Sequence, residues 1–544
     1  MKNNNIYIIL VLLITTLGCT NKNADLVVIN AKIYTASENN FVAKSLVVNN
    51  GKIIEVSKNN LDSKYDTDKI IDAKDRTILP GLIDSHCHFY NLGLDQQVVD
   101  LRGTNSFEEI IDRLKKYNLK NDSDVILGRG WDQNDWDIKK FPINTELNKN
   151  FKDKLVVLER IDGHAYIVND NALELAGIDE KTLVRGGLVL LKNNKPTGVL
   201  IDGPMSMIDQ VLPEKTITEK VKALKKAEEI SFSYGLTTVD DAGLNTGIIS
   251  IIDSLHKLNE LKIKIYAMVS VSKKNIEKFK KSGKIKTSKL NVRSFKVYGD
   301  GALGSRGAAL KNPYCDDPHN YGFLRTDIKD LKYYANEIAG MGFQMNTHAI
   351  GDSTVSVLLK EYQKVLNNIE DPRWRIEHSQ VVDLKEFDLY NDKILPSVQP
   401  THATSDMYWA YDRLGKRIEG AYAFKDLLSS SKKIALGTDF PVEKVNPFHT
   451  FYSSIERKDL NGYPENGFQI ENALTREETL KGMTIWGAYF NFEEKEKGSI
   501  EKGKSADFII IDQNIMEINP KKIPHTKVLK TFIDGELVYQ NDDL

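Results

Sequence analysis

Several histidine, lysine and aspartate residues of this sequence have the types and spacing needed to bind a metal ion. His86 and His88 stand two positions apart and follow the apolar residues Leu82 and Ile83. Side chains two apart on a strand point to the same face. Because neutral imidazole is a standard zinc ligand, the pair could supply half of a metal site. A bare His-x-His motif does not exclude the alternative of two polar residues closing a strand.

Four further side chains of this kind each end an apolar segment downstream, and they are Lys296, His348, His378 and Asp439. Singly, each has an ordinary explanation, since a buried histidine is often a hydrogen-bonded core residue and an aspartate before Phe-Pro can make a turn. A lysine in an apolar strand needs a partner because burying a lone ammonium group is costly. The four residues gain meaning only if the fold brings the segment ends together.

Eight segments have the composition of buried strands, with helical periodicity between several of them. After residues 82–88 the strands are predicted over 235–239, 263–271, 294–298, 342–348, 374–378, 394–399 and 433–439, and two of the helices over 220–232 and 327–339. Eight is the number of strands in a closed (β/α)₈ barrel, whose active sites lie at the carboxyl ends of the strands. We therefore predict an α/β fold with a TIM barrel whose mouth gathers the six side chains.

The rest of the chain predicts two additions to the barrel. Short strands near both termini, over 26–56 and 507–539, indicate one small β-sandwich-like domain built from both chain ends. Residues of about 100–205 are too many for one connection, so we interpret them as an insertion after the first barrel strand that covers the site. The predicted divisions are a signal peptide at 1–18, the small domain at 19–77 and 491–544, and the barrel at 78–490.

The N-terminus has the pattern of an export signal. Lys2 precedes the apolar run 6–14, and Leu17-Gly18-Cys19 follows. A run of about a dozen apolar residues suits a signal peptide and is too short to span a bilayer. A small residue before cysteine resembles a bacterial lipoprotein signal, whose mature chain begins with lipid on Cys19. We expect an exported protein that touches a membrane only through this anchor, on its periplasmic or extracellular face.

The net charge of −2 over 544 residues gives no basic excess that would favour binding of nucleic acid.

The order of the six residues, His-x-His, Lys, His, His, Asp, resembles that of the amidohydrolase superfamily. More narrowly, they resemble amidohydrolase family 3, which includes N-substituted formamide deformylases. The resemblance spans about residues 24–539 and is carried by 79–88, 130–132, 162–164, 296–306, 348–352, 377–378, 399–402, 436–441 and 498–507.

The resemblance implies a role for each of the six residues. His86 and His88 would bind one ion with Asp439 nearby, His348 and His378 would bind a second, and a carboxylated Lys296 would bridge the two. Zinc is the expected metal, as one or two ions, although histidine and carboxylate ligands also suit iron, manganese or nickel. Asp439 would take a proton from the metal-activated water and pass it to the leaving nitrogen.

The reaction implied is hydrolysis of a C–N bond other than a peptide bond, in a small-molecule amide, formamide or cyclic amide. Two alternatives stay open, namely a deaminase using the same metal centre and a catalytically silent metal-binding lipoprotein. The candidate substrate contacts are His164, Trp131, Asp132, Arg306 and His402.

Overall fold

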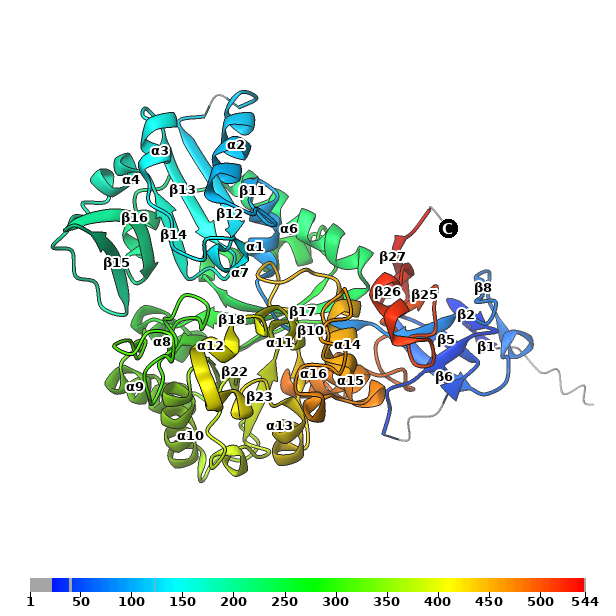
Figure 1. Cartoon of the computed structure of the whole chain (residues 1–544). Coiled ribbons are helices and arrows are strands. Elements are labelled where there is room, and N and C mark those ends of the chain that lie inside the picture. Colours follow the sequence, from blue (N-terminus) through cyan, green and yellow to red (C-terminus); the bar gives the residue numbers. More distant parts are fainter. Residues whose placement is uncertain (1–21, 39–41, 122, 543–544) are drawn as a thin grey trace, which may run out of the picture.

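The computed structural model describes residues 22–38, 42–121 and 123–542 (Figure 1). The predicted signal peptide and Cys19 lie outside these residues. In the described part of the chain, every helix is too short or too polar to cross a bilayer.

Eight parallel strands run through the central sheet in the order β10-β17-β18-β20-β21-β22-β23-β24, and a short ninth strand, β19 (Ile285–Lys286), pairs antiparallel with β20. They are β10 (Leu82–Cys87), β17 (Leu236–Leu244), β18 (Lys264–Ser270), β20 (Leu290–Tyr298), β21 (Gln344–Ala349), β22 (Trp374–His378), β23 (Ile394–Val398) and β24 (Ala435–Leu436). The last strand returns to the first, because the Asp439 amide donates to the His86 carbonyl at 2.8 Å and the His88 amide to the Phe440 carbonyl at 2.7 Å. The predicted (β/α)₈ barrel is confirmed.

Helices follow the barrel strands, and most of them pack on the outer faces of the strands, while α11 (Pro400–Asp406) lies at the barrel mouth (Figure 1). They are α1 (Phe89–Asp95), α6 (Ile217–Ser233), α7 (Thr246–Lys257), α8 (Lys273–Ser282), α9 (Ile328–Gly340), α10 (Asp352–Leu366), α11 (Pro400–Asp406), α12 (Ala410–Leu414), α13 (Phe424–Ser431), α14 (Pro447–Glu456), α15 (Arg476–Gly482) and α16 (Ile485–Phe490). The two helices predicted from periodicity are present as α6 and α9. A capping box between Thr216 and Glu219 begins α6 and satisfies two backbone amides there.

Strand alternation explains how polar side chains reach the barrel interior. In β20, Phe295 and Val297 belong to the large hydrophobic core that the helices cover. Lys296 lies between them and therefore points to the other side, into the barrel. It is nevertheless buried, with 1% of its surface exposed. The same alternation directs His86 and His348 inward.

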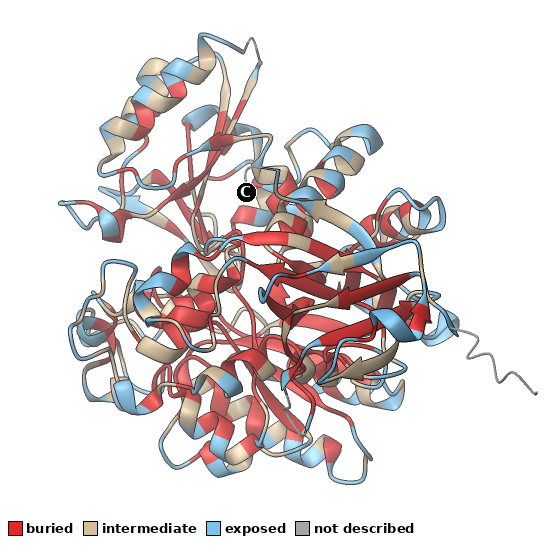
Figure 2. Cartoon of the chain, turned by 90° about the vertical axis from the view of Figure 1, so that its right-hand side faces the viewer, coloured by how far each residue is buried: buried red, intermediate tan, exposed pale blue. Residues whose placement is uncertain are grey.

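The two chain ends together build a pair of small sheets (Figure 2). One sheet has the order β27-β26-β25-β9-β3-β4, formed by β27 (Glu536–Gln540), β26 (Val528–Ile533), β25 (Phe508–Ile511), β9 (Thr77–Pro80), β3 (Lys32–Tyr34) and β4 (Val42–Ala43). The other has the order β6-β5-β2-β8, formed by β6 (Lys52–Ser57), β5 (Ser45–Asn49), β2 (Leu26–Ile29) and β8 (Ile70–Asp72). Buried side chains from both ends, such as Leu46, Ile78 and Phe508, share one core. The predicted boundary at residue 77 falls within β9, which pairs with β3 and β25.

The inserted segment forms a domain with its own sheet and core, at the top of Figure 1. The sheet order is β11-β12-β13-β14-β16-β15, formed by β11 (Val99–Asp100), β12 (Val125–Trp131), β13 (Leu155–Arg160), β14 (Ala165–Val168), β16 (Lys195–Asp202) and β15 (Gly187–Lys192). Its helices are α2 (Phe107–Asn118), α3 (Thr145–Asn150), α4 (Asp170–Leu175) and α5 (Met205–Asp209). We call this the inserted domain.

Candidate metal centre and its cavity

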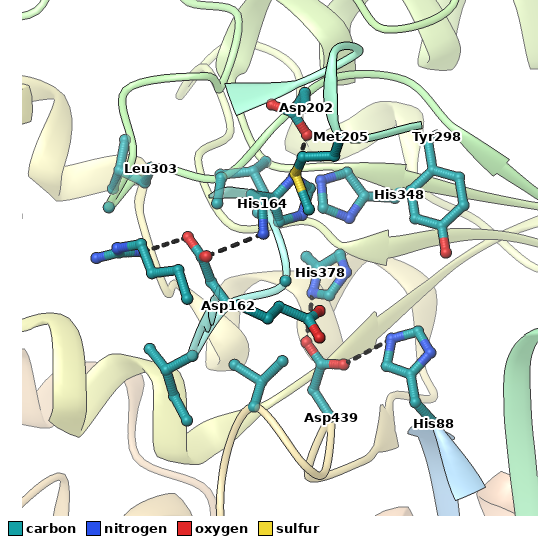
Figure 3. Close-up of a pocket in the computed structure, with 18 of the residues that line it drawn as sticks. His88, Asp162, His164, Asp202, Met205, Tyr298, Leu303, His348, His378 and Asp439 are labelled. Carbon is teal, nitrogen blue, oxygen red and sulfur yellow. Dashed lines mark hydrogen bonds and ion pairs between the residues drawn. The ribbon is translucent and has the colours of Figure 1, made fainter. Parts of the chain in front are cut away.

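A cavity of about 630 Å³ lies between the mouth of the barrel and the inserted domain (Figure 3). The barrel side of its lining, which we call the barrel wall, includes His88, Lys296, His348, His378, His402 and Asp439. The opposite side, the inserted-domain wall, includes Arg129, Asp132, Glu159, Arg160, Asp162, His164 and Asp202. The insertion thus covers the barrel mouth and completes the cavity.

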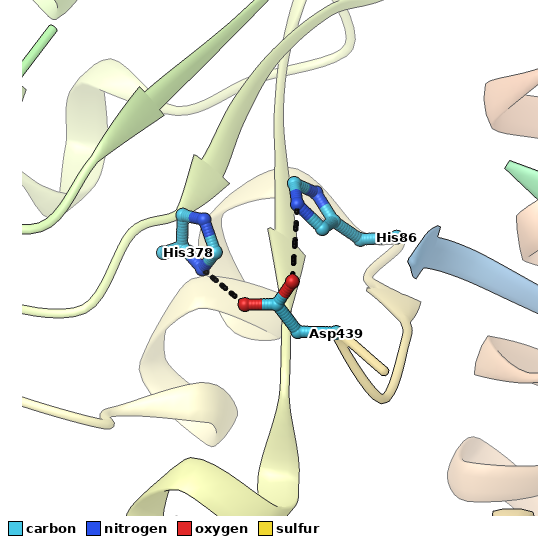
Figure 4. A group of neighbouring side chains, drawn as sticks. All are labelled: His86, His378 and Asp439. Carbon is cyan, nitrogen blue, oxygen red and sulfur yellow. Dashed lines mark ion pairs between the residues drawn. The ribbon is translucent and has the colours of Figure 1, made fainter. Parts of the chain in front are cut away.

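The carboxylate of Asp439 lies among four imidazole rings. Its Oδ1 atom is 3.3 Å from His88 Nε2 and 3.7 Å from His86 Nε2. Its Oδ2 atom is 3.3 Å from His402 Nε2 and 4.0 Å from His378 Nδ1. His86, His378 and Asp439 each offer a ligand atom, and these atoms all lie within 4.8 Å of one another (Figure 4). Donors that were predicted to serve two different ions therefore lie in one compact group.

The spacing of these donor atoms fits a divalent metal ion. Two ligand atoms that are each about 2.1 Å from a tetrahedral zinc ion are roughly 3.4 Å apart. The distances from Asp439 Oδ1 to His88 and His86 bracket that value. This oxygen is buried and has no hydrogen-bond partner among the described residues, which is costly unless a cation satisfies it. The donor set and its geometry are those of a metal site.

Neighbouring groups fix which ring nitrogen is free in His86 and in His378. His86 Nδ1 lies 2.6 Å from Glu377 Oε2, and both side chains are fully buried. His378 Nδ1 lies 2.7 Å from Gln399 Oε1. Such contacts orient imidazole ligands and select their tautomer. His86 therefore presents Nε2 to Asp439, as a metal ligand would.

Lys296 contributes an amine next to this group of donors. Its Nζ atom lies 3.1 Å from His86 Nε2 and is 5.0 Å from the centre of the Tyr298 ring. Burial lowers the pKa of Lys296 to about 8, against the opposing effect of the Glu377 and Asp439 carboxylates. An appreciable share of neutral amine is then present near neutral pH, and this is the form that can react with carbon dioxide.

The electrostatics keep three of the imidazoles neutral and the carboxylate charged, whereas Asp439 raises the pKa of His402 to about 9 against the effect of burial. Burial lowers the pKa of His88 to about 4 and those of His348 and His378 well below the usual range. Burial alone would raise the pKa of Asp439, but the imidazoles of His402 and His88 hold it well below its usual range. These are the protonation states that metal ligands require.

Two members of the group hold left-handed backbone conformations. His378 has φ 73° and Asp439 has φ 62°. Non-glycine residues in this region cost about 1–3 kcal/mol each and persist where the surroundings enforce them, often at functional sites. The backbone of both residues is therefore held for the placement of their side chains.

The structure brings three of the five candidate substrate contacts to the cavity, namely His164, Asp132 and His402. Trp131 instead lies in the core of the inserted domain, fully buried, and its Nε1 donates to the Leu158 carbonyl. Arg306 also lies outside the cavity lining and pairs with Asp316 at 2.8 Å. The Trp131 indole therefore packs in the core of the inserted domain, and the Arg306 guanidinium group is already paired with a carboxylate. Neither side chain reaches the cavity.

Several residues that shape the site were not predicted from the sequence. Glu377 could have been noticed, because a carboxylate inside a buried strand needs a partner. Gln399 begins the 399–402 motif, which by itself indicates no role for the amide. Asp202 and Arg325 pair across the domain boundary at 3.1 Å, and their separation in sequence left no local signal.

Comparisons with known proteins show the family of the chain. The model of the amidohydrolase family matches residues 69–539. The Bacillus subtilis (strain 168) protein named "Putative amidohydrolase YtcJ" is 30% identical over 477 residues, which cover 85% of this chain and 89% of that protein. An N-substituted formamide deformylase from Arthrobacter pascens is 20% identical over 546 residues, covering 95% and 98%. An uncharacterized metal-dependent hydrolase from Pyrococcus horikoshii OT3 superposes with a TM-score of 0.73 at 27% identity, covering 91% of this chain and 99% of that one. The chain belongs to the amidohydrolase family.

Proposed function

We propose that this protein is a metal-dependent hydrolase that cleaves a C–N bond other than a peptide bond, in a small amide, formamide or cyclic amide. The observation that carries the proposal is the position of Asp439. Its Oδ1 atom is separated from the Nε2 atoms of His86 and His88 by the distance expected between two atoms that bind the same metal ion. Its Oδ2 atom faces His402, and Asp439 lines the cavity. In this proposal one residue would both hold a metal and move a proton.

The metal ligands would be His86, His88, His348, His378 and Asp439, with Lys296 as a bridging ligand once its amine is carboxylated. When bound, zinc or a similar ion supplies an acidified water and an electrophilic contact for the scissile carbonyl. The carbamate on Lys296 would be an anion, which explains how a lysine can stand next to the ligand nitrogen of His86. We infer one or two ions, with zinc the best match to the ligand types.

Proton transfer would be the task of Asp439. Its low pKa means that the carboxylate is ionised and able to accept a proton from the attacking water. His402 lies 3.3 Å from Oδ2 and would keep that oxygen oriented. The proton would then pass from Asp439 to the departing nitrogen, so that an amine and a carboxylic acid are released.

A substrate panel tests the proposal. Protein reconstituted with zinc is incubated with N-butylformamide, N-butylacetamide and 2-piperidinone, and the amine formed is measured. Release of amine that depends on added metal supports the proposal. Amidines are tested in parallel, since release of ammonia from these alone would favour the deaminase alternative.

Metal analysis separates both enzymes from the silent alternative. Purified protein is expected to contain about one or two zinc ions per chain by mass spectrometry of the metal, as in sites with this ligand set. Protein that takes up no transition metal would favour a catalytically silent lipoprotein instead.

We also propose that the mature chain is anchored to a membrane by lipid on Cys19. The support is the sequence alone, because Cys19 lies outside the described residues. Stable anchoring at a bilayer surface takes more than one acyl chain, so the proposal requires that Cys19 carry several. Cys19→Ala is expected to move the protein from the membrane fraction to the soluble fraction of cells. Unchanged membrane association of this variant would contradict the anchor.

A further inference from the structure

The inserted domain places one histidine directly beside the metal centre. His164 lies in the turn between β13 and β14, lines the cavity and is 7% exposed. Its ring centre is 5.1 Å from that of His348, and Figure 3 shows the two rings side by side. A residue from outside the barrel thus reaches the place where a substrate bound at the metals would lie.

A buried carboxylate fixes the orientation of this ring. His164 Nδ1 lies 2.6 Å from Asp202 Oδ1, and the Asp202 side chain is fully buried. The same oxygen lies 3.1 Å from Arg325 NH1, which comes from the barrel. Because Asp202 occupies Nδ1, the nitrogen that remains for the cavity is Nε2. The aspartate–histidine pair of serine hydrolases orients its imidazole in this way.

The barrel leaves space for Asp202 in a glycine-rich loop. A Cβ atom added at Gly301 would lie 2.5 Å from Asp202 Oδ2, and one added at Gly307 would lie 3.0 Å from it. The Gly301 carbonyl also lies 3.3 Å from His348 Nε2. The backbone of this barrel loop therefore contacts His348. The loop also leaves room for Asp202, because Gly301 has no side chain.

Arg325 ties this arrangement to the barrel a second time. Its guanidinium group lies 4.8 Å from the centre of the Tyr298 ring, and Tyr298 is the last residue of β20. His164 is consequently held by a chain of contacts that starts at the same strand as Lys296. The contact between Asp202 and Arg325 joins the inserted domain to the barrel, so it does not belong to the core of either domain.

We propose that His164 is a catalytic residue supplied by the inserted domain, that its Nε2 hydrogen-bonds the scissile amide group, and that Asp202 and Arg325 are its positioning residues. The inference rests on the proposed hydrolysis of an amide-type bond. An amide offers both a carbonyl acceptor and, when secondary, an N–H donor to this nitrogen. Removing one preorganised hydrogen bond to a reacting group costs about 100–1000-fold in kcat.

The first test replaces His164 by Gln in zinc-loaded protein. With N-butylformamide, N-butylacetamide or 2-piperidinone, whichever the wild type hydrolyses fastest, kcat/KM is expected to fall about 100-fold or more. Zinc content is expected to stay unchanged, because His164 is not among the ligands. His319→Gln, at an exposed position outside the cavity, is the matched control and is expected to behave like the wild type.

The second test asks whether Asp202 acts through His164. Asp202→Asn alone is expected to lower kcat/KM at least tenfold, but to add less than twofold when His164 is already Gln. Residues that act as one unit show this non-additivity. Arg325→Lys should keep more activity than Arg325→Met. Asp170→Asn, in α4 of the inserted domain and away from the cavity, is the control for Asp202→Asn.

A binding measurement keeps the inference separate from the proposed function. Acetohydroxamate presents a C(=O)–NH group to the metal site and needs no turnover. Its Kd, measured by calorimetry on zinc-loaded protein, is expected to rise at least tenfold in His164→Gln. If the wild type hydrolyses none of the amides, the proposed function fails while this shift still supports the contact. An unchanged Kd for acetohydroxamate, or additive effects of Asp202→Asn and His164→Gln, would overturn the role of His164.

Discussion

The two walls of the cavity satisfy their charges in opposite ways. On the inserted-domain wall, Arg160 pairs with both Asp132 and Asp162, and Arg129 lies 3.4 Å from Asp95. On the barrel wall, the Asp439 carboxylate instead faces imidazoles at 3.3–4.0 Å. These distances are longer than most hydrogen bonds and suit atoms that share a ligand.

This difference separates reactivity from shape. A wall whose charges are already paired needs no ligand to be stable, and it can define the outline of the cavity. A wall whose carboxylate has one oxygen near imidazoles but without a hydrogen-bond partner among the described residues gains most from a cation. We therefore expect changes on the barrel wall to act on metal binding and turnover. Changes to the paired charges of the inserted-domain wall should act on stability and substrate fit, with His164 and Asp202 as the exception on that wall.

The sharpest way to break this comparison is Asp439→Asn. The amide cannot accept the proton, so kcat is expected to fall at least about 1000-fold, within the range for loss of a general base. The remaining ligands should retain the metal, which is measured by mass spectrometry alongside amine release. Asp253→Asn, on the surface of α7, serves as control. Turnover retained in Asp439→Asn would exclude the proton-transfer role.

Lys296→Ala tests whether the barrel wall holds two ions. Loss of the bridging group is expected to lower zinc content by about one ion per chain, and kcat/KM by about 10–100-fold, as for loss of groups that tune metal affinity. Lys311→Ala, which removes an amine paired with Asp383 and Glu386 outside the cavity, should leave both unchanged. A two-ion content that survives in Lys296→Ala would rule out bridging.

The sequence predicted the barrel because its strands obey simple rules. Buried strands alternate with helices, and polar residues at their carboxyl ends stand out from apolar neighbours, as Lys296 does between Phe295 and Val297. Parallel strands that close into a barrel must bring these ends together. The position of His86, His348 and Asp439 around one mouth therefore follows from local patterns plus one topological rule.

The side-chain contacts of the inserted domain could not be predicted in this way. Trp131 and Asp132 are adjacent in sequence, yet one lies in a core and the other on the cavity. Asp202 reaches His164 from 38 positions away, through a sheet whose strand order is not sequential. Contacts between a loop and a distant strand depend on the packing of the whole domain, which leaves no periodic signal.

Arg160→Met tests the inserted-domain wall. Arg160 is 1% exposed, and its loss would leave Asp132 and Asp162 without their cation. The free energy of unfolding is expected to fall by about 3–5 kcal/mol, as when one partner of a buried ion pair is removed. Urea unfolding measures this, and zinc content should not change. Lys149→Met, a partner of Glu146 on the domain surface, should cost less than about 1 kcal/mol. A variant that lost metal but kept its stability would contradict the separation of the two walls.

The smallest effect is expected in the pH dependence of the metal-free protein. The pKa of His88 is lowered to about 4 by burial, whereas that of an unfolded chain is about 6.5. Between these values the unfolded chain binds a proton that the folded chain does not. The free energy of unfolding should therefore fall as the pH is lowered from about 6.5 to about 4, by up to about 3 kcal/mol from this residue.

Urea unfolding with a chelator present, repeated across this pH range, measures how steeply the free energy of unfolding changes with pH. His348 and His378 contribute to this slope with the same sign, because their pKa values are also lowered. His88→Asn should make the slope shallower, and His319→Asn, at an exposed position, should not. If His88→Asn kept the full slope, burial of neutral imidazole on the barrel wall would not be the source of the pH dependence. If His88→Asn removed the part of the slope that His88 contributes, burial of this ring would explain two properties at once. It would weaken the metal-free protein in acid, and it would keep the ring unprotonated and available to a metal ion.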